Sequence, residues 1–298
     1  MLRHQGMFSF LKRGDTELKY QSKIWIKLLC IAFLSLCLVV YVIWSNLSIQ
    51  VTEYTISGNR LPESFSGFRI AQVSDLHNAE FGKGNSNLLK KLKEAQPDMI
   101  VLTGDLIDSR RTDMNVAISF AEKAVNIAPT YYIPGNHESR IAQLEVLYKG
   151  LSDAGVTLLL DDSVQLQRGN DSITLAGILD ISFRQEDPVA NMKEVITDLV
   201  STNDSYTILL SHSPEFFEIY ASRHADLVLT GHVHGGQFRL PFFGGVYAPG
   251  QGFFPKYDAG LFTDCNTNMI ISRGLGNSIF SFRLNNNPEI VIISLQNS

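Results

Sequence analysis

Residues 231–237 (GHVHGGQ) hold two histidines one residue apart, with glycines on both sides. The apolar run at 226–230 predicts a buried strand that leads into this segment as a tight loop. Because residues i and i+2 of an extended segment point the same way, the side chains of His232 and His234 can converge on one point. Neutral imidazole is a common metal ligand, so the pair predicts part of a metal site, although such pairs also occur by chance.

Side chains of the same chemical kind follow four other predicted strands. These strands are expected at residues 68–74, 98–103, 130–133 and 206–210. The side chains that follow them are, in chain order, Asp75 and His77, Asp105 and Asp108, Asn136 and His137, and His212. Each has an ordinary alternative when taken alone, because Asp and Asn after a strand commonly cap a helix or form a turn, and a lone histidine can pack in a core. Five such strand ends in one chain favour a shared metal centre.

The donor set combines carboxylates, a carboxamide and imidazoles, and it contains no thiolate. This chemistry suits Mn²⁺, Fe²⁺/Fe³⁺ or Zn²⁺, with Mg²⁺ also compatible, and it differs from that of a structural cysteine-bound zinc site. The candidate ligands are too many for one ion. We therefore expect two divalent metal ions with a carboxylate between them.

The elements that must position these residues alternate between apolar strands and helices from residue 50 onward, and no repeat or low-complexity linker interrupts them. In α/β sheets, ligands bind beyond the carboxyl ends of the strands, where the candidate residues lie. We therefore predict one α/β domain of two packed sheets with helices outside. Helices are expected at 87–95, 114–126, 141–151, 189–201 and 216–222, and further strands at 49–56, 156–160, 163–167, 173–179, 269–272, 279–283 and 289–295.

The amino-terminal region differs from the rest of the chain in charge and hydropathy. Residues 1–23 are basic, residues 24–45 are almost entirely apolar and long enough to cross a bilayer, and no Lys or Arg follows until Arg60. The positive-inside rule then predicts a cytoplasmic amino terminus, a transmembrane anchor at 24–45 that contacts bilayer lipid, and an extracytoplasmic domain at 46–298. A cleaved signal peptide or a buried helix is the alternative, but there is no small-x-small cleavage site.

The composition limits the partners that the chain can bind and the disulfides that it can form. The chain carries a formal charge of −5 although its amino terminus is basic, so the predicted domain is acidic. An acidic domain without a basic stripe argues against a nuclease or another nucleic-acid-binding protein. Cys265 is the one cysteine in that domain, which excludes a disulfide within it.

The five motifs together resemble the calcineurin-like metallophosphoesterase family in order and content. They are Asp75-x-His77, Gly104-Asp105-x-x-Asp108, Gly135-Asn136-His137-Glu138, Ser211-His212 and Gly231-His232-x-His234. The trailing Gly235-Gly236-Gln237, with Arg239-Leu240-Pro241 and the SRGLG sequence at 272–276, is similar to the membrane-associated bacterial YkuE/YaeI-like branch. The resemblance implies a four-layer α/β/β/α sandwich.

The resemblance also assigns roles to the residues. It implies that one metal takes Asp75, His77 and His234, and that the other takes Asn136, His212 and His232. Asp105 would bridge both ions, and His137, oriented by Asp108, would be the catalytic histidine. His137 would either protonate the leaving group or stabilise the bound phosphate.

These roles imply hydrolysis of a phosphodiester or phosphomonoester by a metal-bridging hydroxide at the outer face of the cytoplasmic membrane. Lipid-linked or cell-envelope substrates would suit that location. The alternative is a catalytically silent, metal-stabilised binding domain anchored to the membrane.

Two further features have open interpretations. Residues 238–257 combine seven aromatic residues with glycines and prolines, so they predict either a long loop packed on the core or a rim that contacts a bilayer or a lipid-like substrate. Arg239 and Arg273 are candidates for phosphate or headgroup contacts, and a structural role is the alternative for each.

Overall fold

A computed structural model of the chain describes residues 4–200, 205–278 and 280–298. The chain divides into two compact units, residues 1–44 and residues 45–298. Most of the first unit belongs to the helix α1 (His4–Leu47), whose segment Lys23–Leu47 contains an 18-residue window with a mean hydropathy of 2.7. By length and composition this segment is a candidate membrane span.

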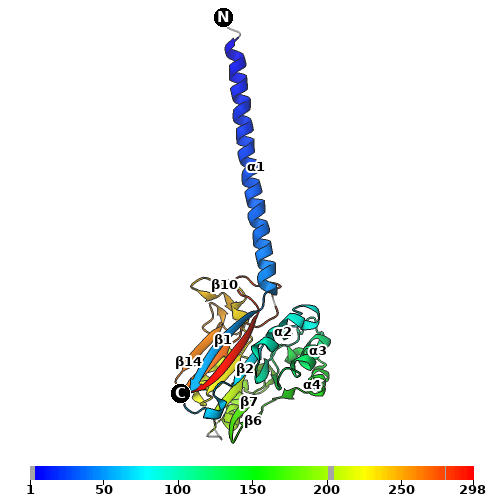
Figure 1. Cartoon of the computed structure of the whole chain (residues 1–298), viewed down its shortest axis with the longest axis vertical. Coiled ribbons are helices and arrows are strands. Elements are labelled where there is room, and N and C mark those ends of the chain that lie inside the picture. Colours follow the sequence, from blue (N-terminus) through cyan, green and yellow to red (C-terminus); the bar gives the residue numbers. More distant parts are fainter. Residues whose placement is uncertain (1–3, 201–204, 279) are drawn as a thin grey trace. The chain divides into compact units, whose positions relative to one another are not determined.

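The second unit contains two six-stranded mixed sheets. In spatial order, the first sheet consists of β1 (Gln50–Gly58), β16 (Glu289–Asn297), β2 (Arg69–Val73), β3 (Met99–Thr103), β4 (Thr130–Ile133) and β5 (Thr157–Leu158). The second consists of β14 (Gly260–Asp264), β15 (Thr267–Ile271), β9 (Leu227–Thr230), β8 (Thr207–Leu210), β7 (Asp171–Gly177) and β6 (Asp162–Arg168). In Figure 1 the first strand, β1, and the last, β16, lie side by side as a parallel pair.

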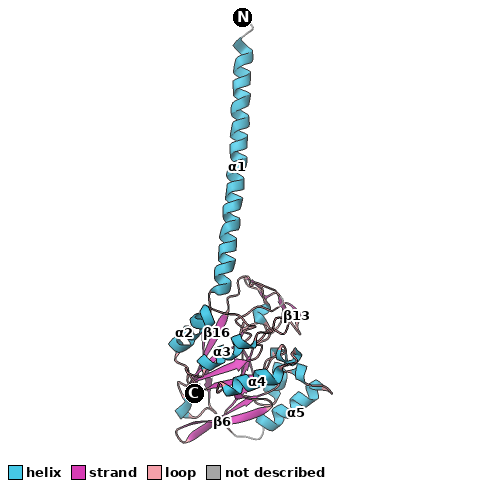
Figure 2. Ribbon diagram, turned by 90° about the vertical axis from the view of Figure 1, so that its right-hand side faces the viewer, coloured by secondary structure: helices cyan, strands magenta, loops and turns pink. Residues whose placement is uncertain are grey.

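In the described residues, five α-helices follow α1, and they pack outside the two sheets, as Figures 1 and 2 show for α2 to α5. Helices α2 (Ser86–Ala95), α3 (Met114–Ala124) and α4 (Leu144–Asp153) pack on the first sheet. Helices α5 (Pro188–Val200) and α6 (Phe217–Ser222) pack on the second. The order helix, sheet, sheet, helix confirms the predicted α/β/β/α sandwich.

The central strands are apolar on both faces because each sheet is covered on both sides. In β3, Ile100 and Leu102 belong to the core beneath the helices, whereas Met99 and Val101 belong to the core between the sheets. Because successive side chains of a strand point to opposite faces, this one strand contributes side chains to both cores. An unbroken apolar run that ends in polar residues is the sequence pattern of such a strand.

One predicted strand was wrong. Residues 280–283 are irregular, and residue 279 lies outside the described residues. The apolar alternation there has another cause, because the rings of Phe280 and Phe282 pack on Phe238, with centroids 5.2 and 5.4 Å away. The two side chains therefore contact a neighbouring loop and do not fill a sheet core.

The aromatic segment 238–257 is more ordered than a plain loop. It forms two short hairpins, of β10 (Arg239–Leu240) with β11 (Gly244–Gly245) and of β12 (Tyr247–Ala248) with β13 (Gly252–Phe253). These hairpins and the edge strand β14 were not predicted. Their strands are too short, or too rich in glycine, to show a clear period of two.

Candidate metal centre

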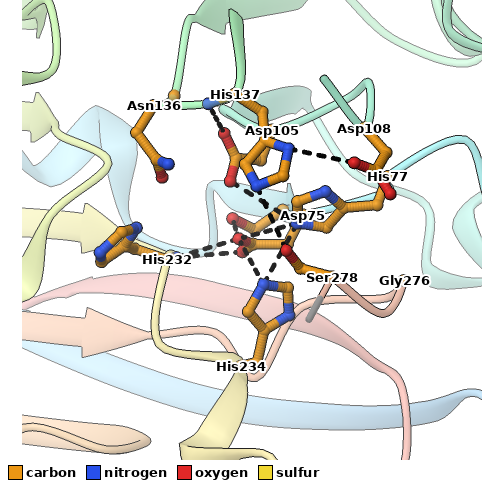
Figure 3. Close-up of polar contacts among 12 residues, drawn as sticks. Asp75, His77, Asp105, Asp108, Asn136, His137, His232, His234, Gly276 and Ser278 are labelled. Carbon is orange, nitrogen blue, oxygen red and sulfur yellow. Dashed lines mark hydrogen bonds and ion pairs between the residues drawn. The ribbon is translucent and has the colours of Figure 1, made fainter. Parts of the chain in front are cut away.

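The strand ends singled out from the sequence meet at one edge of the sandwich. Strands β2, β3 and β4 run parallel in the first sheet, and β8 and β9 run parallel in the second, so their following loops converge. Figure 3 shows side chains from these loops pointing toward a common centre. The structure brings together all the residues predicted for the site, namely Asp75, His77, Asp105, Asp108, Asn136, His137, His212, His232 and His234.

A first cluster consists of Asp75, His77 and His234. The two histidine Nε2 atoms are 3.1 Å apart, and Asp75 Oδ1 is 3.6 Å from His234 Nε2 and 3.9 Å from His77 Nε2. Two donors that are each about 2.1 Å from one ion lie roughly 3–4 Å apart. The three side chains therefore have the spacing required to hold one cation.

A second cluster contains Asp105, His212 and His232, with Asn136 beside it. His212 Nε2 lies 3.3 Å from Asp105 Oδ2, 3.2 Å from His232 Nδ1 and 3.3 Å from Asn136 Oδ1. The His212 Nδ1 atom lies 2.8 Å from the carbonyl oxygen of Thr103, which accepts its proton and leaves Nε2 with a free lone pair. This spacing fits a second cation.

Asp105 lies between the two clusters. Its Oδ2 atom is 3.5 Å from His77 Nε2 in the first cluster and 3.3 Å from His212 Nε2 in the second. Burial raises the pKa of the Asp105 carboxyl, but His212 and His77 outweigh burial and hold this pKa well below its usual value. An ionised carboxylate that touches both clusters fits the bridging role expected for Asp105.

The backbone around the clusters is strained and closely packed. Asp75, His77, Asp105, His232 and His234 all have positive φ angles, between 46° and 72°, which non-glycine residues rarely adopt. A Cβ atom at Gly135 would overlap the Asp105 carboxylate, and one at Gly231 would overlap Ser74 Oγ. These two positions therefore require glycine for the loops to approach one another.

A buried glutamate, Glu138, ties two ligand loops together. Its carboxylate accepts N–H bonds from Gly135 (2.8 Å), Asp105 (2.9 Å) and Ile107 (3.3 Å). Burial and the nearby Asp105 raise the pKa of Glu138 to about 8. We assigned Glu138 no role from the sequence, although its place next to His137 in the motif was a signal for one.

The contacts of His137 indicate which of its nitrogens carries the proton. The Ser109 N–H donates to His137 Nδ1 over 3.0 Å, so a neutral ring carries its proton on Nε2. Burial lowers the pKa of His137 despite the neighbouring carboxylates, which favours this neutral form. Asp108 Oδ1 is 3.5 Å from Nδ1 and accepts a shorter bond, 3.0 Å, from the Arg110 N–H.

Ser278 contacts His137 from the opposite side of the ring. Its Oγ atom lies 3.2 Å from His137 Nε2 and accepts a 3.0 Å bond from Arg110 Nη2. Nothing in the sequence near Ser278 indicated this contact, because it depends on a loop 141 residues away from His137.

The centre lies on the wall of a cavity of about 590 Å³. Asp105, Asn136, His137, His232 and His234 line it from the metal side. The remaining lining includes two arginines, Arg110 and Arg140, and the apolar side chains of Ile181, Tyr247, Pro249 and Phe280. A cavity that combines cation ligands, arginines and apolar groups can hold a phosphoester that carries an apolar substituent.

The two arginines chosen from the sequence lie in internal ion pairs and do not line this cavity. Arg239 pairs with Asp258 at 2.9 Å, and Arg273 pairs with Glu289 at 2.7 Å. The structure therefore favours the structural alternative for both. Arg110 and Arg140, which were not singled out, line the cavity in their place.

Comparison with known proteins places the chain in a family. The calcineurin-like phosphoesterase family matches residues 68–236, which is more than half of the chain. The chain is 29% identical over 256 residues to the uncharacterized metallophosphoesterase YkuE of Bacillus subtilis, covering 84% of this chain and 86% of that protein. It is 29% identical over 236 residues to phosphodiesterase YaeI of Escherichia coli, covering 76% and 82%.

A solved structure agrees with the fold. The protein TT1561 of Thermus thermophilus superposes with a TM-score of 0.50 at 14% identity, covering 70% of this chain and 91% of that one. From the family match and its relatives, the chain belongs to the calcineurin-like phosphoesterase family and is a metal-dependent phosphoesterase.

Proposed function

We propose that this protein hydrolyses phosphoester bonds with two divalent cations, one held by Asp75, His77 and His234 and the other by Asn136, His212 and His232. Asp105 would contribute to both ions. The position of the Asp105 carboxylate, within 3.5 Å of a histidine in each cluster, carries this proposal. When bound, the cations would polarise the phosphoryl oxygens and activate water at neutral pH.

The residues of the chain would supply the remaining steps. The His137 Nε2 atom lies on the cavity side of the centre. An anionic phosphoester bound beside it would favour the imidazolium form, with Asp108 next to Nδ1, and this imidazolium would donate its Nε2 proton to the departing oxygen and return to the neutral ring. Arg110 and Arg140 would bind free phosphoryl oxygens with their N–H groups. Asn136, being neutral, would limit the negative charge around its cation.

We further propose that residues 24–45 cross the cytoplasmic membrane, with residues 1–23 in the cytoplasm and 46–298 as the catalytic domain outside. The candidate span Lys23–Leu47 and the basic residues before it support this topology. Lipid-linked or cell-envelope phosphoesters are then the available substrates. The name of the E. coli relative, a phosphodiesterase, favours diesters.

The activity is tested with the full chain in nanodiscs, assayed on p-nitrophenyl phosphate and bis-p-nitrophenyl phosphate with Mn²⁺, while bound metals are counted by mass spectrometry. We expect turnover that a chelator abolishes and added Mn²⁺ restores. Two bound metals without turnover of either ester would instead support a catalytically silent binding domain.

The topology is tested with the exposed Cys265. A membrane-impermeant maleimide added to intact cells should label Cys265 if the domain is outside, with Cys265→Ser as the unlabelled control. Labelling only after the cells are lysed would contradict the proposed orientation.

A further inference from the structure

A group of exposed apolar side chains includes two that line the catalytic cavity, Tyr247 and Phe280. Phe242 is fully exposed, and Phe243 and Phe253 are each 74% exposed. Residues 240–255 contain no charged residue. We call the whole group the aromatic surface, and it consists of Leu240, Phe242, Phe243, Tyr247, Phe253, Phe254, Phe280, Phe282 and Leu284.

Backbone contacts join the segments of this surface. The Arg239 N–H donates to the Leu284 carbonyl, and Phe238 bridges to Leu284. The two hairpins are joined through Val246, whose N–H donates to the Phe238 carbonyl over 2.8 Å. The backbone segments that carry the aromatic surface are therefore joined to one another. Exposed apolar side chains gathered on joined segments in this way mark a binding surface.

Hydrogen bonds link this surface to the end of the candidate membrane span, and they indicate which partner the surface contacts. Asn46 Oδ1 accepts from the Arg283 N–H (2.8 Å), and Asn46 Nδ2 donates to the Arg283 carbonyl (2.9 Å). Asn287 Nδ2 donates to the carbonyls of Ser45 and Ser48. The candidate membrane span ends at Leu47. These bonds therefore keep the segment that carries Phe282 and Leu284 next to the last residues of the span.

We infer that the aromatic surface rests on the bilayer that holds the chain's own span. The cavity then opens at the membrane, because Tyr247 and Phe280 belong to both the surface and the cavity lining. Exposed Phe and Leu side chains insert at the boundary between lipid headgroups and acyl chains, and Tyr favours the same interface. An amphiphilic phosphoester could keep its apolar tail in the bilayer while its phosphoryl group reaches the centre, so we assign phosphate-bearing membrane lipids as the substrate class.

This inference rests on the proposed hydrolysis and on the proposed membrane span. Its first test measures contact with lipid and does not depend on activity. The full chain, with Cys30 and Cys37 changed to Ala, is placed in nanodiscs that contain brominated phosphatidylcholine. A bimane label is attached at Phe243→Cys or Phe282→Cys in a Cys265→Ser background, or at the native Cys265 as the control.

Cys265 is a suitable control because it lies far from Asn46. It lines a separate pocket with Gly58, at the end of β1 opposite Gln50, and a strand of nine residues is roughly 26 Å long. We expect brominated lipid to quench the labels at 243 and 282 at least about twofold and the label at 265 not at all. Equal signals at all three positions would overturn the inference, whether the surface then binds a protein or stays in water.

The second test measures the substrate class. The variant Phe242→Ser/Phe243→Ser changes two side chains that do not line the cavity. Val146→Ser is the control, because Val146 is an exposed apolar residue on α4, away from this surface. Rates are compared on bis-p-nitrophenyl phosphate and on nanodiscs made from a bacterial phospholipid extract, from which water-soluble phosphate products are counted.

We expect the double variant to keep its rate on the soluble ester and to lose about tenfold on the lipid extract, while Val146→Ser keeps both. An unchanged lipid rate, or a wild-type chain that cleaves the soluble ester and no lipid, would overturn the substrate assignment. Failure of the proposed hydrolysis is distinct, because the wild-type chain would then cleave neither substrate.

Discussion

The two halves of the metal centre differ in their access to substrate. Of the first cluster, Asp75, His77 and His234, only His234 lines the cavity. Of the second, both Asn136 and His232 line it, and His212 is buried beneath them. A closed set of protein ligands is typical of a structural ion, whereas an open position is typical of a catalytic one. We therefore expect the first ion to be held more tightly and the second to face the substrate.

The residues that hold the ligand side chains in place also differ between the two halves. The second cluster has the Thr103 carbonyl behind His212, so a strand end of the first sheet orients a ligand of the second. The first cluster has the buried Arg283 beside it, with Nη2 3.3 Å from His234 Nδ1. Arg283 also donates to the Arg273 carbonyl (2.6 Å) and to Asn277 Oδ1 (3.1 Å). The loop that carries Arg283 therefore helps to position the ligands of the first half.

The largest effect is expected from Asp105→Asn, which removes the charge shared by the two halves. We expect loss of metal from both sites and a fall in kcat/KM of about 10³-fold or more. Metal counting and the diester assay measure this, with Asp153→Asn as the control, because Asp153 is an exposed residue at the end of α4. An Asp105→Asn protein that keeps two metals and its activity would show that the two halves are independent.

His137→Gln separates chemistry from metal binding. We expect both metals to remain and kcat to fall about 10²–10⁴-fold, because the proton donor is lost. The loss should be larger for an ester with a poor leaving group than for the p-nitrophenyl ester, whose leaving group needs little protonation. If metal is lost instead, His137 acts as a ligand and its assignment is wrong.

The difference between the two halves is tested by His77→Ala against Asn136→Ala. The first change should remove the enclosed ion. The second should lower the affinity for the cavity-facing ion about 10–100-fold while the enclosed ion stays bound. Titration of metal-free protein with Mn²⁺ should therefore restore activity to Asn136→Ala at high concentration and not to His77→Ala. The reverse pattern would invert the assignment of the two halves.

The smallest effect is expected from Asn46→Ala, which removes two hydrogen bonds to the backbone of Arg283. Each bond contributes about 1 kcal/mol, so the domain should unfold a few degrees lower. We also expect a several-fold loss of kcat, because the same loop positions Ser278 beside His137. Asn266→Ala, in an exposed turn, is the control. A stability loss with unchanged kcat would show that the loop does not shape the site.

Much of the fold and of the candidate site could be predicted because the relevant signals are local. An apolar run such as 99–103 can be buried on both faces only inside a layered sheet, and the polar residues after it must then lie at the sheet edge. Residues with the donor chemistry of metal ligands followed five strands, so their convergence could be expected before any distance was known.

Other features could not be predicted because they depend on contacts between distant segments. The Phe280 and Phe282 alternation resembled a strand and instead reflects packing on Phe238. Arg239 looked as suitable for phosphate as Arg110, and only the position of Asp258 shows that Arg239 is already paired. Charge and type alone do not show which partner a side chain finds.

The sequence by itself determined the donor chemistry, the order of the strands that carry it and the apolar segment before the domain. Only the tertiary structure decided that Glu138 joins two ligand loops, that Ser278 reaches His137 and that Asn46 holds the loop of the aromatic surface. The physical reason is the range of the interactions. Periodicity and strand-end chemistry are properties of neighbouring residues, whereas these three contacts join residues that are 33, 141 and 237 positions apart.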